Sequence, residues 1–401
     1  MMELLDYLQD PELVARFQRR CGLFLVEASC RGPERTRSQN GVQLHRENTH
    51  GSERRGSWDH QDKNSNHKPT LNGPCANSCS RPQYEVKNWL LHFLFLFSSS
   101  LGHEVFYITG LPCIHWNLDP FLCRRLVNMW TLVMYIGQVM KDVLRLPRPS
   151  SPPVVKLEPR VDAEYGLPST HAMAATSIFF TLLLSAPSRV QFQFEIGLLI
   201  AVTLSSLVCL SRIYTGMHSV LDVACGFLIS AVIILVTYPF WESFDRFQLT
   251  NPFSPVVALS LLLFLSYTYP ELDHYTTTRG DTTTILGVCA GCSVGYWVSE
   301  QLGQTFEPQG LPVPFPTLTA PSVALGVGRF LLGVVALVGT RQIVKTLSLQ
   351  MLYAWYRVPK TDKNARRRKE IEVPSKFATY TAVGLVNSIL VNRFFAFIGL
   401  L

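Results

Sequence analysis

Eight polar residues, grouped in three short clusters, are of the types that bind and transfer a phosphoryl group. In chain order they are Lys141 and Arg148; Ser169, Thr170 and His171; and Arg212, His218 and Asp222. Guanidinium groups match phosphate oxygens in bidentate geometry. Imidazoles serve as nucleophiles and as proton carriers near neutral pH. The residue types therefore predict phosphate-ester chemistry, provided that the fold brings the clusters together.

The two histidines can divide the work of nucleophile and proton carrier. Asp222 follows His218 by four residues, so the two share a helix face and can hydrogen-bond. A carboxylate on one imidazole nitrogen fixes the tautomer and leaves the other nitrogen free to attack phosphorus. His171 lies on a different segment and can protonate the leaving alkoxide and later activate water. We expect His218 to be the nucleophile, Asp222 to orient it, and His171 to be the acid and base.

The phosphoryl oxygens need positive charge and hydrogen-bond donors, which the other five residues provide. Lys141, Arg148 and Arg212 supply three cations. Ser169 adds a hydroxyl, and a helix that starts at Thr170 adds backbone N–H groups with a favourable dipole. We expect these five residues to bind the phosphate of the substrate.

Some of these residues have a simpler explanation when taken alone. Lys and Arg often flank spanning helices, which is the favoured explanation for Lys141 by itself. A single interfacial histidine such as His171 is more often structural. Asp222 is harder to explain in this way, because an acid inside an apolar run is costly and usually marks function or a buried partner. The whole set favours a catalytic site.

A metal centre is not expected. The clusters contain one carboxylate and three cations, whereas a two-metal phosphatase needs several acids. Cys289 and Cys292 spell C-x-x-C, but they lie inside an apolar run, where packing is the favoured role. We expect neither a metal nor another cofactor.

The composition indicates a membrane protein with a polar N-terminal region. Hydrophobic residues make up 47% and charged residues 16% of the 401 residues. About nine apolar runs are long enough to span a bilayer, centred near residues 97, 134, 179, 203, 229, 262, 291, 332 and 388. Open strands cannot cross lipid, so the runs should be helices. The predicted fold class is an all-α, polytopic membrane bundle.

Two parts of the chain differ in kind. Residues 1–85 are predicted to be a polar, largely disordered region, and 86–401 a membrane domain with its catalytic core at about 86–270. The net charge is +7, but the basic residues form no face with interleaved aromatics, so nucleic-acid binding is not expected.

Helix parity predicts that the clusters meet. The first leaves the second apolar run, the second enters the third run, and the last joins the fourth to the fifth. If run two exits at one membrane face, run three enters from it and run four returns to it. All three clusters then lie at the same face, whichever face that is.

The patterns K-x6-R-P, P-S-x-H and S-R-x5-H-x3-D resemble those of the type 2 phosphatidic acid phosphatase superfamily. The second motif of that superfamily usually has glycine where this chain has Thr170. Three flanking stretches, Tyr135–Asp142, Pro149–Glu158 and Arg366–Pro374, resemble sphingosine-1-phosphate phosphatases more closely. The resemblance covers about residues 85–401. It implies a phosphohistidine on His218, catalysis without metal, and the roles given above for His171, Asp222, Lys141, Arg148, Ser169 and Arg212.

The resemblance also implies a lipid substrate and a location. The substrates would be sphingosine 1-phosphate and dihydrosphingosine 1-phosphate, and the chain would lie in the endoplasmic reticulum membrane with a lumenal active site. The basic loop at Lys360–Lys369 is expected on the same face, and the positive-inside tendency would make that face cytosolic. Two alternatives stay open: a phosphatase for a soluble ester, as in glucose-6-phosphatase, and a non-catalytic lipid-binding or transport relative.

Overall fold

Helices form nearly all of the regular structure, as predicted for an all-α membrane bundle. The computed structural model of the protein describes residues 2–26, 83–158, 164–273, 275–303, 313–314, 319–359, 362 and 364–400. One compact unit comprises Met1–Leu25 and Tyr84–Leu401.

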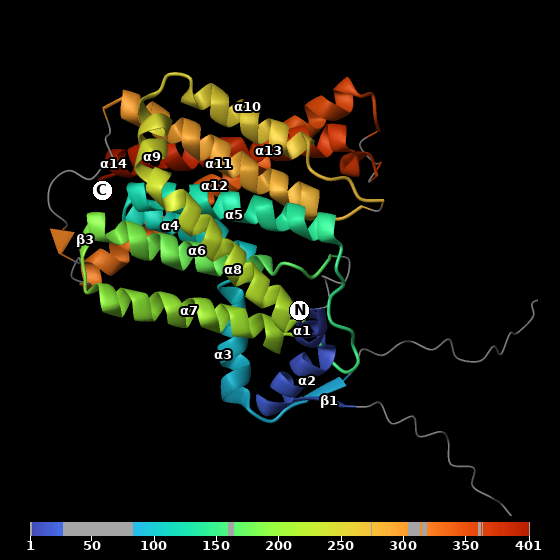
Figure 1. The fold of residues 1–401 in the computed structure, drawn as a ribbon. Helices are drawn as coiled ribbons and strands as arrows, with labels where there is room; N and C mark the ends of the chain where they lie inside the picture. Colours follow the sequence, from blue (N-terminus) through green and yellow to red (C-terminus); the bar gives the residue numbers. More distant parts are fainter. Residues whose placement is uncertain are drawn as a thin grey trace, which may run out of the picture. The chain divides into compact units, whose positions relative to one another are not determined.

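The described part of the chain contains both long helices at the predicted runs and shorter helices between them (Figure 1). They are α1 (Met2–Gln9), α2 (Pro11–Arg20), α3 (Trp89–Ser100), α4 (Glu104–Asn117), α5 (Pro120–Leu144), α6 (Thr170–Ser185), α7 (Phe194–Tyr214), α8 (Val220–Thr237), α9 (Trp241–Thr250), α10 (Ser254–Tyr267), α11 (Thr278–Gln301), α12 (Ala320–Trp355), α13 (Lys369–Leu385) and α14 (Val391–Phe397). Short turns of helix are η2 (Ala186–Ser188), η3 (Tyr238–Phe240), η4 (Ala365–Arg367) and η5 (Val386–Leu390). Strand β1 (Leu23–Val26) pairs with β2 (Gln83–Val86), and β3 (Val190–Gln191) pairs in parallel with β4 (Val313–Pro314).

Five helical segments of the described chain are long and apolar enough to cross a membrane. They are Thr170–Ser188, Phe194–Tyr214, Val220–Thr250, Ala320–Trp355 and Lys369–Phe397. Each of the nine predicted centres falls within a helix or helical turn, but nine crossings stay a prediction. Helix α4 was not anticipated as a separate element.

Helix α5 is long but carries ionisable side chains, and they find partners inside the bundle. It packs between α6 and α11 (Figure 1). Asp142 Oδ2 accepts hydrogen bonds from Tyr269 Oη and from Thr278 Oγ1, both at 2.7 Å. Arg125 Nε donates to Asp245 Oδ2 at 2.6 Å. Such pairing makes charged groups tolerable in a membrane bundle.

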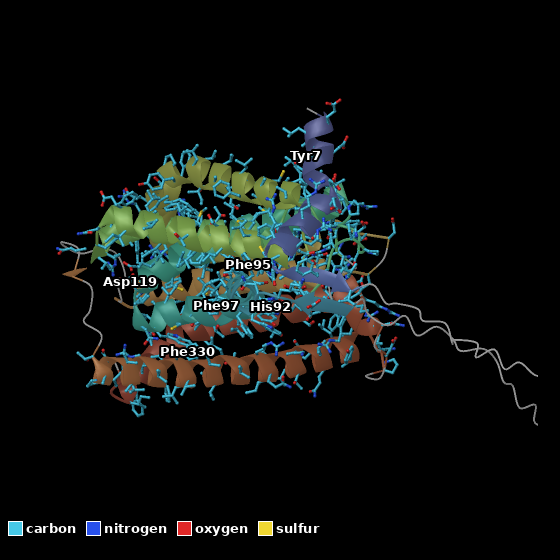
Figure 2. The ribbon with its side chains drawn as sticks, turned by 90° about the horizontal axis from the view of Figure 1, so that it is seen from below. Tyr7, His92, Phe95, Phe97, Asp119 and Phe330 are labelled. Carbon is cyan, nitrogen blue, oxygen red and sulfur yellow. The ribbon has the colours of Figure 1, made fainter. Side chains whose placement is uncertain are left out.

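Helix α3 shows how the apolar side chains divide between the interior and the surroundings (Figure 2). Phe95 is buried and stacks on Tyr214 of α7, with 4.7 Å between ring centroids. His92 Nδ1 lies 2.9 Å from the hydroxyl of the same tyrosine. Phe97 is 64% exposed, as suits a side chain that faces lipid. Helix α3 thus supports the C-terminal end of α7.

The first helices pack on the membrane part of the chain through a buried glutamine. Gln18 of α2 donates through Nε2 to the backbone oxygens of Val155 (2.7 Å) and Tyr214 (2.8 Å). Its Oε1 accepts from Val155 N at 3.0 Å. Residues 2–26 therefore form two helices and a strand, and α2 is attached to the membrane part, although the polar region was expected to be largely disordered. Residues 27–82 lie outside the described part, and the boundary at residue 85 stays a prediction.

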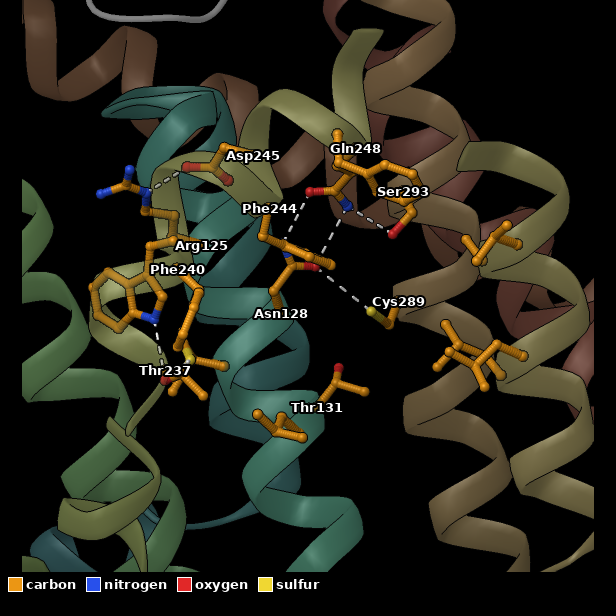
Figure 3. A pocket seen from close by; sticks show the side chains of 18 of the residues that line it. Arg125, Asn128, Thr131, Thr237, Phe240, Phe244, Asp245, Gln248, Cys289 and Ser293 are labelled. Atoms are coloured by element: carbon orange, nitrogen blue, oxygen red, sulfur yellow. Dashed lines mark hydrogen bonds and ion pairs between the residues drawn. The ribbon is translucent and has the colours of Figure 1, made fainter. Parts of the chain in front are cut away.

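An apolar cavity of about 440 Å³ opens beside the N-terminal half of α5 (Figure 3). Phe240 and Phe244 line it from the α8–α9 region, and Cys289 lines it from α11. The polar clusters do not contribute to it. Tyr135, the lining residue of α5 nearest to Lys141, precedes it by six residues, which is about 9 Å along a helix at about 1.5 Å per residue. The cavity is therefore separate from the clusters.

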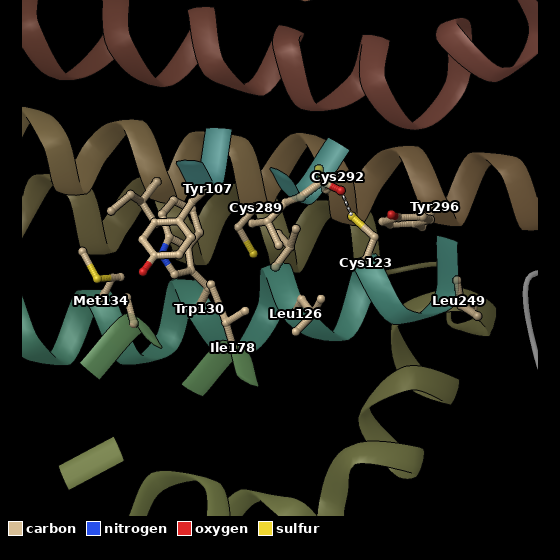
Figure 4. Packing of buried hydrophobic residues seen from close by; sticks show 14 residues of the cluster. Tyr107, Cys123, Leu126, Trp130, Met134, Ile178, Leu249, Cys289, Cys292 and Tyr296 are labelled. Atoms are coloured by element: carbon tan, nitrogen blue, oxygen red, sulfur yellow. Dashed lines mark hydrogen bonds between the residues drawn. The ribbon is translucent and has the colours of Figure 1, made fainter. Parts of the chain in front are cut away.

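The main buried cluster joins α4, α5, α6 and α11 (Figure 4). Trp130 and Leu126 of α5 meet Tyr107 of α4 there. Cys289 and Cys292 are both buried members of this cluster, in the packing role favoured for them. This packing fixes the middle of α5 against its neighbours, and α5 carries Lys141 near its C-terminal end.

Helix α11 approaches α13 and the following turn η5 closely because glycines lie at the contact. A Cβ atom on Gly287 would lie 3.0 Å from the backbone oxygen of Phe377, and one on Gly295 would lie 2.6 Å from Ser388 Cβ. A Cβ on Gly291 would collide with the backbone of Thr381. Small residues at such spacing let membrane helices pack backbone to backbone.

Candidate active site

The three polar clusters meet at one end of the bundle, where α5 ends, α6 begins and α7 turns into α8. Three hydrogen bonds join them: Lys141 Nζ donates to Thr170 Oγ1 (3.2 Å), Ser169 N donates to Asp222 O (3.0 Å), and Arg148 Nη1 donates to Met217 O (3.1 Å). The parity argument predicted this meeting. Residues separated by some eighty positions in the chain thus form one site.

Local backbone features set where the first two clusters end and begin. Helix α5 stops at Arg145, which adopts a left-handed conformation with φ of 52° and redirects the chain. Ser169 is the N-cap of α6, but its side chain makes no capping hydrogen bond. Because N-cap serines usually bond to their own helix, this hydroxyl and the free N–H groups of the first turn remain available to an anion.

The third cluster is fixed by a capping box. Ser219 Oγ accepts from Asp222 N at 3.1 Å, and Asp222 Oδ2 accepts from Ser219 N at 2.8 Å. The same Oδ2 lies 3.6 Å from His218 Nδ1, beyond a direct hydrogen bond. The expected His218–Asp222 hydrogen bond is therefore a near contact here, and Oδ2, the oxygen that faces the ring, is the one that accepts from the helix cap. Catalytic contacts are often loose without substrate.

His218 lies in the turn before α8 and is 1% exposed. Burial, and then the cations of Arg148, Arg212 and Lys141, hold the pKa of this imidazole well below its ordinary value. The ring is therefore neutral at neutral pH, which is the form that can attack phosphorus. Arg148 reaches this turn directly, because its Nη1 donates to the backbone oxygen of Met217, the residue before His218.

Five buried polar atoms of this site have no hydrogen-bond partner among the residues that the structure describes. They are Ser169 Oγ, His171 Nε2, Arg212 Nε, His218 Nδ1 and Asp222 Oδ1. Burying such a group without a partner costs about 1–3 kcal/mol. A gathering of five is expected where a polar ligand supplies the missing hydrogen bonds.

Sequence reasoning missed two glutamates that contact the phosphate-binding cations. Glu158 forms a bidentate ion pair with Arg212, at 2.8 Å to Nη1 and 3.2 Å to Nη2. Glu164 Oε2 lies 3.5 Å from Lys141 Nζ and 3.4 Å from Arg148 Nη2. Both lie in the connection between α5 and α6. The sequence does carry a signal for them, because two acidic residues in a loop between basic motifs are candidates for ion pairs with those motifs.

A third histidine also borders the site. The His103 ring contacts the His171 ring edge-on, with 5.4 Å between centroids, and its Nε2 lies 3.9 Å from Glu158 Oε1. Gly102 permits this approach, because a Cβ there would lie 2.7 Å from the His171 ring. Nothing in the spacing of the three clusters pointed to this residue, which begins the unanticipated helix α4.

Comparisons with known proteins agree with this site. The PAP2 superfamily matches residues 123–246. Sphingosine-1-phosphate phosphatase 2 of Homo sapiens is 49% identical, and the match covers 100% of both chains. Sphingosine-1-phosphate phosphatase 1 of Rattus norvegicus is 37% identical over 98% of this chain and 97% of its own. The chain belongs to the sphingosine-1-phosphate phosphatase family of the PAP2 superfamily. A dihydrosphingosine 1-phosphate phosphatase of Schizosaccharomyces pombe is more distant, with 28% identity over 56% of this chain and 57% of its own.

The PAP2 match contains all eight residues of the three clusters as well as Glu158 and Glu164. The comparison with solved structures found no match to this chain. Within the described residues, no three His, Cys, Asp or Glu side chains are placed to hold a metal ion. The positive charge of the site comes from Lys141, Arg148 and Arg212.

Proposed function

We propose that this membrane protein hydrolyses sphingosine 1-phosphate and dihydrosphingosine 1-phosphate to the sphingoid base and inorganic phosphate. The names of its relatives in mammals and fission yeast support this substrate class. The observation that carries the proposal is a buried imidazole, His218, beside Asp222 and in one site with the cations Lys141, Arg148 and Arg212. That arrangement suits attack on a phosphate whose charge the cations neutralise.

In the first step, the Nε2 atom of His218 attacks phosphorus. Its Nδ1 faces the Asp222 carboxylate 3.6 Å away, which stabilises the positive charge that develops on the ring. The bond from phosphorus to the lipid oxygen breaks, and His171 gives that oxygen a proton. Sphingosine leaves, and the phosphoryl group remains on His218 as a phosphohistidine.

In the second step, His171 takes a proton from a water molecule, which attacks phosphorus. The bond from nitrogen to phosphorus breaks, inorganic phosphate leaves, and His218 is restored. Lys141, Arg148 and Arg212 hold the phosphoryl oxygens through both steps, together with Ser169 and the start of α6 at Thr170. Because the cations take the role that metal ions have in other phosphatases, the reaction needs no metal.

A substrate panel with purified protein in detergent tests this function. Sphingosine 1-phosphate should release phosphate with and without a chelator, and glucose 6-phosphate should release little. Faster hydrolysis of glucose 6-phosphate would favour a phosphatase for soluble esters. No release from any ester would favour a lipid-binding or transport protein.

We propose further that the chain lies in the endoplasmic reticulum membrane with its active site on the lumenal face. The family resemblance supports this location. Lys369 pairs with Glu271, and Arg145 with Asp273 in the same loop, so the basic segment before α13 lies at the active-site end. The positive-inside tendency alone would place that end in the cytosol. A glycosylation acceptor inserted at residues 159–163 tests the proposal: modification supports a lumenal site, and its absence beside a modified cytosolic-end control contradicts it.

A further inference from the structure

Glu158 forms an ion pair with Arg212, the arginine that we expect to bind the substrate phosphate. Its two carboxylate oxygens bind the two Nη atoms of Arg212, the fork-to-fork geometry that a phosphate also adopts. Ser99 Oγ reinforces the pair, since it accepts from Arg212 Nη1 at 2.8 Å and donates to Glu158 Oε1 at 3.1 Å. When a phosphate takes Arg212, the carboxylate must give up at least one of these contacts.

A displaced Glu158 carboxylate needs another positive partner. The side chain is 21% exposed and Arg212 only 1%, so water replaces the lost contacts poorly. Burial acts most strongly on the pKa of Glu158 and raises it, but the charge and hydrogen bonds of Arg212, with His103 and Ser99, together hold the pKa below its ordinary value. When Arg212 turns to the phosphate, the ionised carboxylate loses its main cation and depends on another one.

Sphingoid phosphates carry the required partner in a suitable place. Their ammonium group is on the carbon next to the one that bears the phosphate. The ammonium is therefore close to the leaving oxygen, which is bonded to the first carbon and which His171 protonates in the proposed reaction. Glu158 lies on this side of the site, because its Oε1 is 3.9 Å from His103 Nε2 and the His103 ring packs against His171.

We infer that Glu158 is a specificity-determining residue: it pairs with Arg212 before substrate binds and then with the ammonium of the sphingoid phosphate. The inference rests on the proposed function and deepens it. Phosphate and ammonium together replace one ion pair by two. A lipid phosphate without a free amine opens the Arg212–Glu158 pair and leaves the carboxylate without a cation, so it binds less well.

The other loop glutamate is a matched control. Glu164 also binds phosphate-site cations, Lys141 and Arg148, at 3.5 and 3.4 Å. Within the described part of the chain, its ion pairs are with Lys141 and Arg148 and not with His103 or His171. Removing its charge should change the hydrolysis of amine-bearing and amine-free substrates in the same proportion.

The test compares Glu158→Gln, Glu164→Gln and wild type on sphingosine 1-phosphate and on N-acetylsphingosine 1-phosphate, in which an amide replaces the ammonium. The readout is the ratio of the two kcat/KM values. Because a charged hydrogen bond is worth about 1.5–3 kcal/mol, Glu158→Gln should lower this ratio roughly ten- to a hundredfold. Glu164→Gln should leave it near that of wild type. Hydrolysis of the amide substrate shows that each variant is folded.

An unchanged ratio in Glu158→Gln would overturn the inference, whether both rates rise or fall, because Glu158 would then act only on Arg212. If that variant does not fold, the pair Glu158→Asp and Glu158→Asn decides, since only the aspartate should favour the free amine. The proposed function fails separately, if wild type hydrolyses neither lipid.

Discussion

His218 combines burial with surrounding positive charge, and this combination determines its protonation. Burial and the cations of Arg148, Arg212 and Lys141 hold its pKa below the ordinary value near 6.5, and the neighbouring His171 acts in the same direction. The neutral ring is the reactive form. Activity should therefore persist below pH 6.5 and disappear as the pH falls through the lowered pKa.

Removing one of these cations should move the acid limb of the pH profile. In Arg148→Gln the imidazole loses a repulsive charge, so its pKa rises and kcat/KM should begin to fall at a higher pH than in wild type. The same lipid is used for both proteins, so titration of the substrate phosphate affects them equally. An acid limb that stays in place or moves to lower pH would show that Arg148 does not act on His218.

Thr170 is the residue at which this chain departs from the usual superfamily pattern, and its side chain contacts the site. Its Oγ1 accepts from Lys141 Nζ at 3.2 Å, and its methyl group faces Gly137 of α5. A hydrogen bond to a charged group is worth about 1.5–3 kcal/mol. The threonine therefore positions Lys141, which a glycine there would not do through a side chain.

Replacing Thr170 by valine keeps the shape and removes the hydrogen bond. Thr170→Val should lower kcat/KM for sphingosine 1-phosphate by about tenfold, whereas Thr170→Ser should lose less because it keeps the hydroxyl. Steady-state kinetics of the purified variants measure this. Equal losses in both would assign the effect to packing against Gly137 instead.

At the scale of the elements, the packing of α11 on α13 depends on glycines with no room for a side chain. Gly291 faces the Thr381 backbone, and Gly384 faces the backbone oxygen of Val288, 2.6 Å from where its Cβ would lie. Backbone cannot move aside as a flexible side chain can. The contact therefore tolerates no added atom without a shift of one helix.

Gly291→Ala should destabilise the protein by about 1–3 kcal/mol through overpacking. Gly339→Ala in α12 is the matched control, because a Cβ there meets nothing within 4 Å and alanine favours a helix. Thermal unfolding in detergent measures both. If the two variants unfold at the same temperature, the close helix contact is not needed for stability.

Helices could be predicted where neighbouring residues mark them, by an apolar run or by a motif at the helix start. Apolar runs identified α5 through α8, and the P-S-T-H motif located the start of α6. Helix α4 has a proline, Pro112, inside it and begins at an unremarkable histidine, so its sequence gives no clear boundary. The attachment of α2 depends on Gln18, whose hydrogen bonds reach residues 137 and 196 positions away. Such contacts leave no periodic pattern.

At the scale of the whole molecule, counting helices was enough to bring three distant clusters together. The count could not say which loop side chains would fill the site. Glu158 and Glu164 come from one connection, and their role as partners of Arg212, Lys141 and Arg148 follows from how that loop folds back. Counting helices thus predicts that the three clusters lie together. Which acidic side chains neutralise their cations is seen only in the structure.

Trapping the phosphoenzyme tests the central claim most directly. Wild-type protein is mixed with sphingosine 1-phosphate labelled on phosphorus, quenched in alkali and digested, and the labelled peptide is sequenced. We predict acid-labile label on His218, and neither label nor phosphate release in His218→Ala. Label on another residue, or phosphate release by His218→Ala near the wild-type rate, would contradict the account.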